Sequence, residues 1–120
     1  MKSILIVDDE ADVLFALKSS LERHKEFKVM VASDGEEALK VLENDTPDLI
    51  VLDLVMPKIT GQDLLKLIRQ NIKTVATPVI ISTGNRETAT MVDLMNLGAT
   101  DYLMKPYDIR ELTKTINTYI

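Results

Sequence analysis

Short apolar segments rich in β-branched residues alternate with longer stretches of helical periodicity along the whole chain. The apolar segments are Ile4–Val7, Val29–Ala32, Leu49–Leu52, Val79–Ile81 and Tyr102–Met104. They are short and continuously apolar, which is typical of parallel strands that helices cover on both faces. Between them apolar residues recur at helical spacing. In the fourth helical stretch Met91, Leu94 and Met95 are expected to lie in the core, with an adaptable output surface as the alternative for part of the Met91 and Met95 stripe. This alternation favours an α/β fold.

Five strand–helix units in succession predict one parallel sheet and five helices. Because crossovers between parallel strands are right-handed, we expect a doubly wound sandwich of three layers. A sheet of five such strands most often has the flavodoxin-like order 2-1-3-4-5, whereas a closed barrel needs more units than this chain contains. With 120 residues and no linker-like segment, we expect a single domain that spans residues 1–120.

Two of the expected helices carry signals for their first residues. Ser33 and Glu36 fit a capping box at the start of the second helix. Asp108 and Glu111 fit the N-cap and the third helical position of the last helix, where acidic side chains are favourable. These signals predict where the two helices begin.

Composition excludes several classes of function. The chain has no cysteine, which rules out disulfides, thiolate catalysis and thiolate metal sites. Its 14 basic and 19 acidic residues give a net charge of −5 and only 4% of residues are aromatic, so we expect no direct contact with nucleic acid. No apolar run is long enough to span a bilayer and the N-terminus is unlike a signal peptide, so we expect a soluble, cytoplasmic protein without membrane contact.

Polar residues follow the expected strands at their carboxyl ends, which is where ligands bind in doubly wound sheets. Asp8 and Asp9 follow the first strand and Asp53 follows the third. Thr83 follows the fourth strand and Lys105 follows the fifth. Because the first and third strands are neighbours in the expected order, the three carboxylates should meet in one pocket, with a hydroxyl and an ammonium close by.

These residue types favour phosphoryl chemistry. Clustered carboxylates repel one another unless a cation lies among them, and hard oxygen ligands suit Mg²⁺. A metal and an ammonium neutralise the oxygens of a phosphoryl group, and a hydroxyl donates a hydrogen bond to it. An aspartate carboxylate is itself a nucleophile that forms an aspartyl phosphate. The pattern therefore points to a phosphoryl group accepted by an Asp.

With these residues in view, the chain resembles the receiver domain of two-component response regulators over essentially its whole length. Four motifs carry the resemblance, each at the end of its own expected strand: Ile4–Glu10, Asp53–Pro57 with Gly61, Pro78–Gly84 and Gly98–Pro106. A single acidic pair or a single Lys-Pro is a weak signal, but four motifs in order are a strong one. The resemblance implies a phospho-accepting signalling switch with a flavodoxin-like fold.

The resemblance also implies a role for each residue of the site. Asp53 is the expected phosphoacceptor, and Lys105 is expected to pair with a phosphoryl oxygen. Mg²⁺, with Mn²⁺ as a substitute, is expected to bind Asp9, Asp53 and the main-chain carbonyl of Val55. Asp8 is expected to contact the metal mainly through a bound water.

Thr83 and Tyr102 resemble the pair that switches in this family. The hydroxyl is expected to move toward the phosphoryl group and the aromatic ring to turn inward behind it. The new charge would then repack the face formed by the fourth helix, the fifth strand and the fifth helix. The family also leads us to expect a cis peptide bond between Lys105 and Pro106.

The implied phosphodonor is a histidine kinase or a histidine phosphotransfer domain, and an output domain or protein of unknown identity would read the switched face. We expect a monomer or a phosphorylation-dependent dimer. We expect no enzyme in the ordinary sense, but a phosphoacceptor that assists its own phosphorylation and dephosphorylation. Phe15 falls off the main apolar stripe of the first helix, so an exposed Phe15 would be a candidate contact for the phosphodonor.

Three alternatives fit parts of the pattern. A receiver-like docking scaffold that is never phosphorylated shares the fold, although the complete set of acids, Thr and Lys argues against it. A phosphohydrolase with an aspartyl nucleophile usually has a second Asp two residues later, where this chain has Val55. A flavin-binding protein would have a phosphate loop rich in glycine and hydroxyls after the first strand, where this chain has carboxylates.

Overall fold

The computed structural model describes residues 1–23, 26–56, 58–84 and 88–120, and of residues 88–90 only the backbone. One parallel sheet of five strands has the order β2-β1-β3-β4-β5, which confirms the predicted flavodoxin-like topology. Strands and helices alternate as β1 (Lys2–Val7), α1 (Ala11–Glu22), β2 (Phe27–Ala32), α2 (Gly35–Asn44), β3 (Leu49–Asp53), α3 (Gly61–Gln70), β4 (Val79–Thr83), α4 (Thr88–Asn96), β5 (Asp101–Met104) and α5 (Ile109–Tyr119). Within the described ranges, none of these helices has the length and apolar character that crossing a membrane requires.

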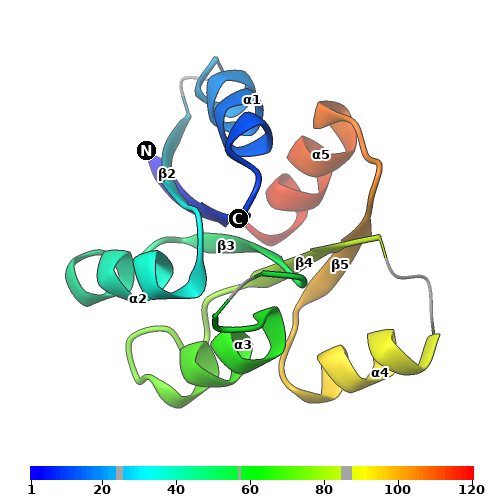
Figure 1. The fold of residues 1–120 in the computed structure, drawn as a ribbon. Coiled ribbons are helices and arrows are strands. Elements are labelled where there is room, and N and C mark those ends of the chain that lie inside the picture. Colours follow the sequence, from blue (N-terminus) through cyan, green and yellow to red (C-terminus); the bar gives the residue numbers. More distant parts are fainter. Residues whose placement is uncertain (24–25, 57, 85–87) are drawn as a thin grey trace.

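The helices form two layers that enclose the sheet (Figure 1), with α1 and α5 on one face and α2, α3 and α4 on the other. Strand β1 shows why the strands are continuously apolar. Ile4 and Ile6 pack with α1 and α5, whereas Leu5 and Val7 pack with the other three helices. Because successive side chains point to opposite faces of the sheet, each buried strand supplies both cores.

The start of α2 differs by one residue from the predicted capping box. Asp34 is the N-cap, and its carboxylate accepts a hydrogen bond from the Glu37 amide at 2.8 Å. Glu37 reaches back to Ser33, accepting from its hydroxyl at 2.6 Å and from its amide at 3.2 Å. Ser33 and Glu36 do not form the predicted box, because the neighbouring Asp34 takes the capping position.

At α5 the prediction is confirmed. Asp108 is the N-cap and its carboxylate accepts from the Glu111 amide at 2.9 Å. The N-cap Asp108 therefore marks the point at which the loop after β5 ends and α5 begins.

The prediction for the fourth helix was wrong in part. Leu94 is buried, but Met95 is 45% exposed and Met91 is only partly buried. The physical reason is the position of α4 near β5, which is the last strand of the sheet. A helix at the sheet edge has less surface to cover, so fewer of its apolar side chains are buried.

Gly61 lets α3 begin directly beside the end of β3. A Cβ atom on Gly61 would lie 2.7 Å from the Asp53 carbonyl oxygen and 2.8 Å from the Leu54 Cα atom. Both are backbone atoms, which cannot move aside as a flexible side chain can. The Gly61 amide also donates to the Leu54 carbonyl oxygen at 3.1 Å, so this contact fixes the loop that follows Asp53.

We therefore expect Gly61→Ala to destabilise the fold by about 1–3 kcal/mol, the usual cost of forcing a group into a packed site. The measurement is urea-induced unfolding, with Gly84→Ala as the matched control because a Cβ there meets nothing within 4 Å. Gly84→Ala should change stability by less than about 1 kcal/mol. Equal losses in the two variants would contradict the close approach at Gly61.

Candidate functional site

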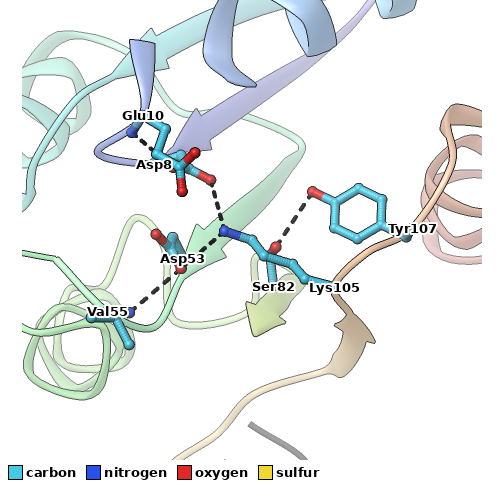
Figure 2. A network of polar contacts seen from close by, with 7 residues as sticks. All are labelled: Asp8, Glu10, Asp53, Val55, Ser82, Lys105 and Tyr107. Atoms are coloured by element: carbon cyan, nitrogen blue, oxygen red, sulfur yellow. Dashed lines mark hydrogen bonds and ion pairs between the residues drawn. The ribbon is translucent and has the colours of Figure 1, made fainter. Parts of the chain in front are cut away.

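The carboxyl ends of β1, β3 and β5 bring the predicted site together. Asp53 is the last residue of β3, and Asp8 directly follows β1. Because Val7 pairs with Leu52 in the sheet, Asp8 and Asp53 lie side by side on adjacent strands. Lys105 directly follows β5 and reaches both of them from the other side (Figure 2). The predicted convergence of these residues is therefore present.

The ammonium group of Lys105 lies between the two carboxylates. Its Nζ atom donates to Asp8 Oδ2 at 3.3 Å and lies 3.5 Å from Asp53 Oδ1. Both acids are buried, with 2% of Asp8 and 5% of Asp53 exposed to solvent. The Lys105 amide donates to the Thr83 carbonyl oxygen at 2.8 Å, which anchors the lysine to β4. One cation thus connects the ends of β1, β3 and β5.

Asp53 retains its proton more readily than an ordinary aspartate. Burial is the main cause of its raised pKa, and the negative charges of Asp8 and, less strongly, Asp9 act in the same direction. The ammonium of Lys105 and the Val55 amide, which donates to Asp53 Oδ1 at 3.4 Å, oppose this pKa shift without cancelling it. Asp53 therefore ionises less readily than a solvated aspartate, mainly because burial withdraws water from its carboxylate.

The pKa of the Lys105 ammonium group is raised by the two acids beside it. Burial lowers the pKa of its ammonium group, but the charges of Asp53 and Asp8 outweigh burial and raise the pKa above its ordinary value. The lysine is therefore a permanent cation at this site. It can neutralise part of an incoming phosphoryl group without losing its proton.

A group of carboxylates that fits a divalent cation lies beside this pair. Oxygen atoms of Asp8, Asp9 and Glu10 lie within 4.8 Å of one another, with Asp8 buried and the other two exposed. The Glu10 amide donates to Asp8 Oδ1 at 2.9 Å, which fixes the turn after β1. Carboxylate oxygens are the ligands that Mg²⁺ prefers, so the donor set is consistent with a magnesium site. Sequence reasoning placed Asp53 with Asp8 and Asp9 and gave Glu10 no role.

The two predicted switch residues occupy different environments. Thr83 is buried at the end of β4, where its carbonyl oxygen holds the Lys105 amide. Tyr102 lies on β5, pairs with Ile81 in the sheet and is 39% exposed. The predicted cis peptide bond between Lys105 and Pro106 is present. Pro57, part of the second motif, lies outside the described residues.

Sequence reasoning missed Tyr107 and its contact with β4. The Ser82 hydroxyl donates to the Tyr107 hydroxyl at 3.4 Å (Figure 2). Burial raises the pKa of Tyr107. The negative charges of Asp8 and Asp53 act in the same direction, and the positive charge of Lys105 acts against it. The available signal was a tyrosine placed two residues after the predicted lysine, but only the folded chain shows which strand its hydroxyl contacts.

The fold and the site define an α/β domain with an acidic, lysine-containing pocket at the carboxyl edge of a parallel sheet. Comparison with known protein families identifies this class. The family model of the response regulator receiver domain matches residues 4–117 of the chain. The chain belongs to this family. It is a signalling phosphoacceptor domain of two-component systems rather than a conventional enzyme.

Individual relatives agree with this assignment. The chain is 44% identical over 120 residues to the transcriptional regulatory protein CpxR of Escherichia coli (strain K12), covering 100% of this chain and 50% of that protein. It is 40% identical over 119 residues to the alkaline phosphatase synthesis transcriptional regulatory protein PhoP of Bacillus subtilis (strain 168), covering 99% of this chain and 48% of that protein. The chain thus spans about half the length of these curated relatives.

Among solved structures, the chemotaxis protein CheY4 of Vibrio cholerae superposes with a TM-score of 0.94 at 28% identity, covering 100% of this chain and 99% of that one. The receiver domain of the Francisella response regulator 1452 superposes with a TM-score of 0.90 at 33% identity, covering 99% and 96% of the two chains. Both likenesses extend over nearly the full length of each chain, so the whole sheet and both helical layers are shared.

The raised pKa of Asp53 predicts a stability effect. Because the folded protein holds this proton more tightly than the unfolded chain does, the ionised carboxylate costs stability at pH values above the raised pKa. The cost disappears as the pH falls through that pKa. Without divalent metal, Asp53→Asn should therefore stabilise the fold at neutral pH by about 0.5–2 kcal/mol, the range for removing an unfavourable charge.

The measurement is urea unfolding in EDTA at neutral and at mildly acidic pH, where the gain should shrink. Asp45→Asn, which changes an exposed carboxylate at the end of α2, is the matched control and should shift stability by less than about 0.5 kcal/mol. A loss of stability in Asp53→Asn at neutral pH would show that the carboxylate is favourably paired instead.

Proposed function

We propose that this protein accepts a phosphoryl group on Asp53 from a phosphohistidine of a histidine kinase or histidine phosphotransfer domain. The observation that carries the proposal is the buried Asp53 carboxylate, held beside Asp8 with the Lys105 ammonium between them. An Asp53 oxygen attacks phosphorus, the bond from phosphorus to the donor's imidazole nitrogen breaks, and its electron pair stays on the imidazole. Lys105 stabilises the negative charge on the phosphoryl oxygens.

Mg²⁺, or Mn²⁺ as a substitute, would be held by Asp8, Asp9, Asp53 and the main-chain carbonyl of Val55. When bound, the cation supplies charge neutralisation for both the carboxylates and the phosphoryl oxygens. The clustered oxygens of Asp8, Asp9 and Glu10 support this set, because they offer several carboxylate ligands close together. Asp8 would act mainly through a metal-bound water.

The proposed switch couples Thr83 to Tyr102. The Thr83 hydroxyl would move toward the phosphoryl group, and the Tyr102 ring, now 39% exposed, would turn inward behind it. Val92 and Met95 on α4 are 52% and 45% exposed near the same edge of the sheet. An inward turn of Tyr102 would therefore change an apolar surface of α4, β5 and α5 that an output partner could bind.

We propose further that residues 1–120 form one receiver domain, and that the protein acts in the cytoplasm as a monomer or a phosphorylation-dependent dimer. The whole-chain activities of the longer relatives are not carried over, because this chain matches about half of their length. The alternative function is a docking scaffold that is never phosphorylated. The complete set of Asp8, Asp53, Thr83 and Lys105 at one edge of the sheet favours the phosphoacceptor.

Phosphorylation is tested by intact mass after incubation with acetyl phosphate. We expect one phosphoryl group on the wild type only when Mg²⁺ is present, because the metal offsets the excess negative charge at the site. Asp53→Asn should carry none. Asp45→Asn, with the same chemical change at the far end of α2, should behave as the wild type. A folded wild type without an adduct, which also fails to bind beryllofluoride, would favour the scaffold.

Docking of the phosphodonor has a candidate surface on α1. Phe15 is 75% exposed, and a groove of about 500 Å³ runs between α1 and the segment after β5. The groove is lined by Glu10, Val13, Ala16, Leu17, Lys105, Pro106 and Tyr107. Because Lys105 belongs to both the groove and the site, an apolar helix seated there would lie next to Asp53.

We expect Phe15→Ala to slow phosphorylation by the cognate kinase or phosphotransfer domain at least about tenfold, since exposed aromatic anchors carry much of an interface's binding energy. Phosphorylation by acetyl phosphate should be unchanged, because the small donor needs no docking surface. The exposed Ile72 of the α3–β4 connection provides a control, and Ile72→Ala should affect neither donor. An unchanged rate with the kinase would remove Phe15 from the proposed interface.

A further inference from the structure

The segment that carries Lys105 is attached to β4 at two points. The Lys105 amide donates to the Thr83 carbonyl oxygen at 2.8 Å. Two residues later, the Tyr107 hydroxyl accepts a hydrogen bond from the Ser82 hydroxyl at 3.4 Å. Ser82 and Thr83 are consecutive residues of β4, so one short stretch of strand holds both ends of the segment 105–107.

Ser82 also contacts the other side of the site. It pairs with Asp53 in the sheet, and its carbonyl oxygen accepts from the Leu54 amide at 3.3 Å. Its side chain is buried, with 2% of the residue exposed. Ser82 therefore lies between the chain that carries the proposed nucleophile and the chain that carries the proposed cation.

The Tyr107 ring is placed to transmit this attachment to Lys105. It packs against the core formed with α1 and α5 and lines the groove beside α1. Figure 2 shows the Tyr107 hydroxyl directed at Ser82 and the Lys105 side chain extending from the same short segment toward Asp8 and Asp53. The hydrogen bond to Tyr107 restricts the ring, because losing it would leave the buried Ser82 hydroxyl without this partner.

We propose that the hydrogen bond between Ser82 and Tyr107 holds Lys105 in the position from which its ammonium reaches both Asp8 and Asp53. Tyr107 is thus a positioning residue for phosphoryl transfer, acting through Lys105 and not on the phosphoryl group itself. Its effect on phosphorylation rests on the proposed function of Asp53. The effect of Tyr107 on the order of the Lys105 side chain is independent of the proposed function of Asp53.

The first test is the rate of phosphorylation by acetyl phosphate with Mg²⁺. Tyr107→Phe keeps the ring and the groove but removes the hydroxyl, and Ser82→Ala removes the other partner. Each should lower the rate by about three- to tenfold, the range expected for loss of one hydrogen bond. The double variant should be no slower than either single one, because both changes break the same contact. Multiplying effects, or a Tyr107→Phe rate equal to wild type, would overturn the proposal.

Tyr119→Phe is the matched control. It removes a tyrosine hydroxyl that donates to Asp101 Oδ2 at 2.7 Å, at the far end of α5 from the site. The rate of this variant should equal that of the wild type. An equal slowing in Tyr119→Phe and Tyr107→Phe would mean that losing any tyrosine hydroxyl loosens the fold, and would contradict a positioning role.

A second measurement needs no phosphorylation. NMR order parameters of the Lys105 side chain should fall in Tyr107→Phe and in Ser82→Ala and stay unchanged in Tyr119→Phe. If the wild type takes up no phosphoryl group but these order parameters fall, the proposed function is wrong and the positioning of Lys105 stands. If they do not fall, the positioning claim is wrong whatever the phosphorylation result.

Discussion

The ion pairs of Lys105 with Asp8 and Asp53 are the interaction on which this site depends. They join residues that are far apart in the sequence, and they exist because a parallel sheet delivers the carboxyl ends of β1, β3 and β5 to one edge. Asp8 and Asp53 are desolvated at that edge, while Lys105 also lines the groove beside α1. The fold thus places a buried carboxylate beside a second acid and a cation through strand position alone.

The same arrangement explains why the pocket suits a metal and a phosphoryl group together. Among the described residues, four carboxyl groups, those of Asp8, Asp9, Glu10 and Asp53, lie near the single ammonium of Lys105. Burial is the main cause of the raised pKa of Asp53, and the negative charges of Asp8 and Asp9 add to it. A divalent cation among these carboxylates would offset their negative charge and lower the pKa of Asp53.

Most of the fold and the predicted convergence of the site followed from the sequence, for a physical reason. Strands buried on both faces, such as Leu49–Asp53, are continuously apolar, and strand order and crossover handedness then determine which residues meet. Local details were less predictable. Ser33 and Asp34 are adjacent residues of types that both cap helices, so the start of α2 was ambiguous by one position. The burial of Met95 depends on how far the sheet extends beyond β4, which no local pattern shows. The contact of Tyr107 with Ser82 joins a loop to a strand 25 residues earlier, so no local pattern reports it.

The central claim is that Asp53, and not one of the neighbouring acids, takes the phosphoryl group. Borohydride reduces an aspartyl phosphate to homoserine, so phosphorylated protein can be reduced, digested and sequenced by mass spectrometry. We predict homoserine at position 53 alone, because Asp53 is the acid at the phosphoacceptor position of the family's motif. Asp8 is also buried and in contact with Lys105, but both of its carboxylate oxygens accept hydrogen bonds, Oδ1 from the Glu10 amide and Oδ2 from Lys105. Homoserine at position 8 or 9, or at no position in protein that carries the phosphoryl group, would contradict the account.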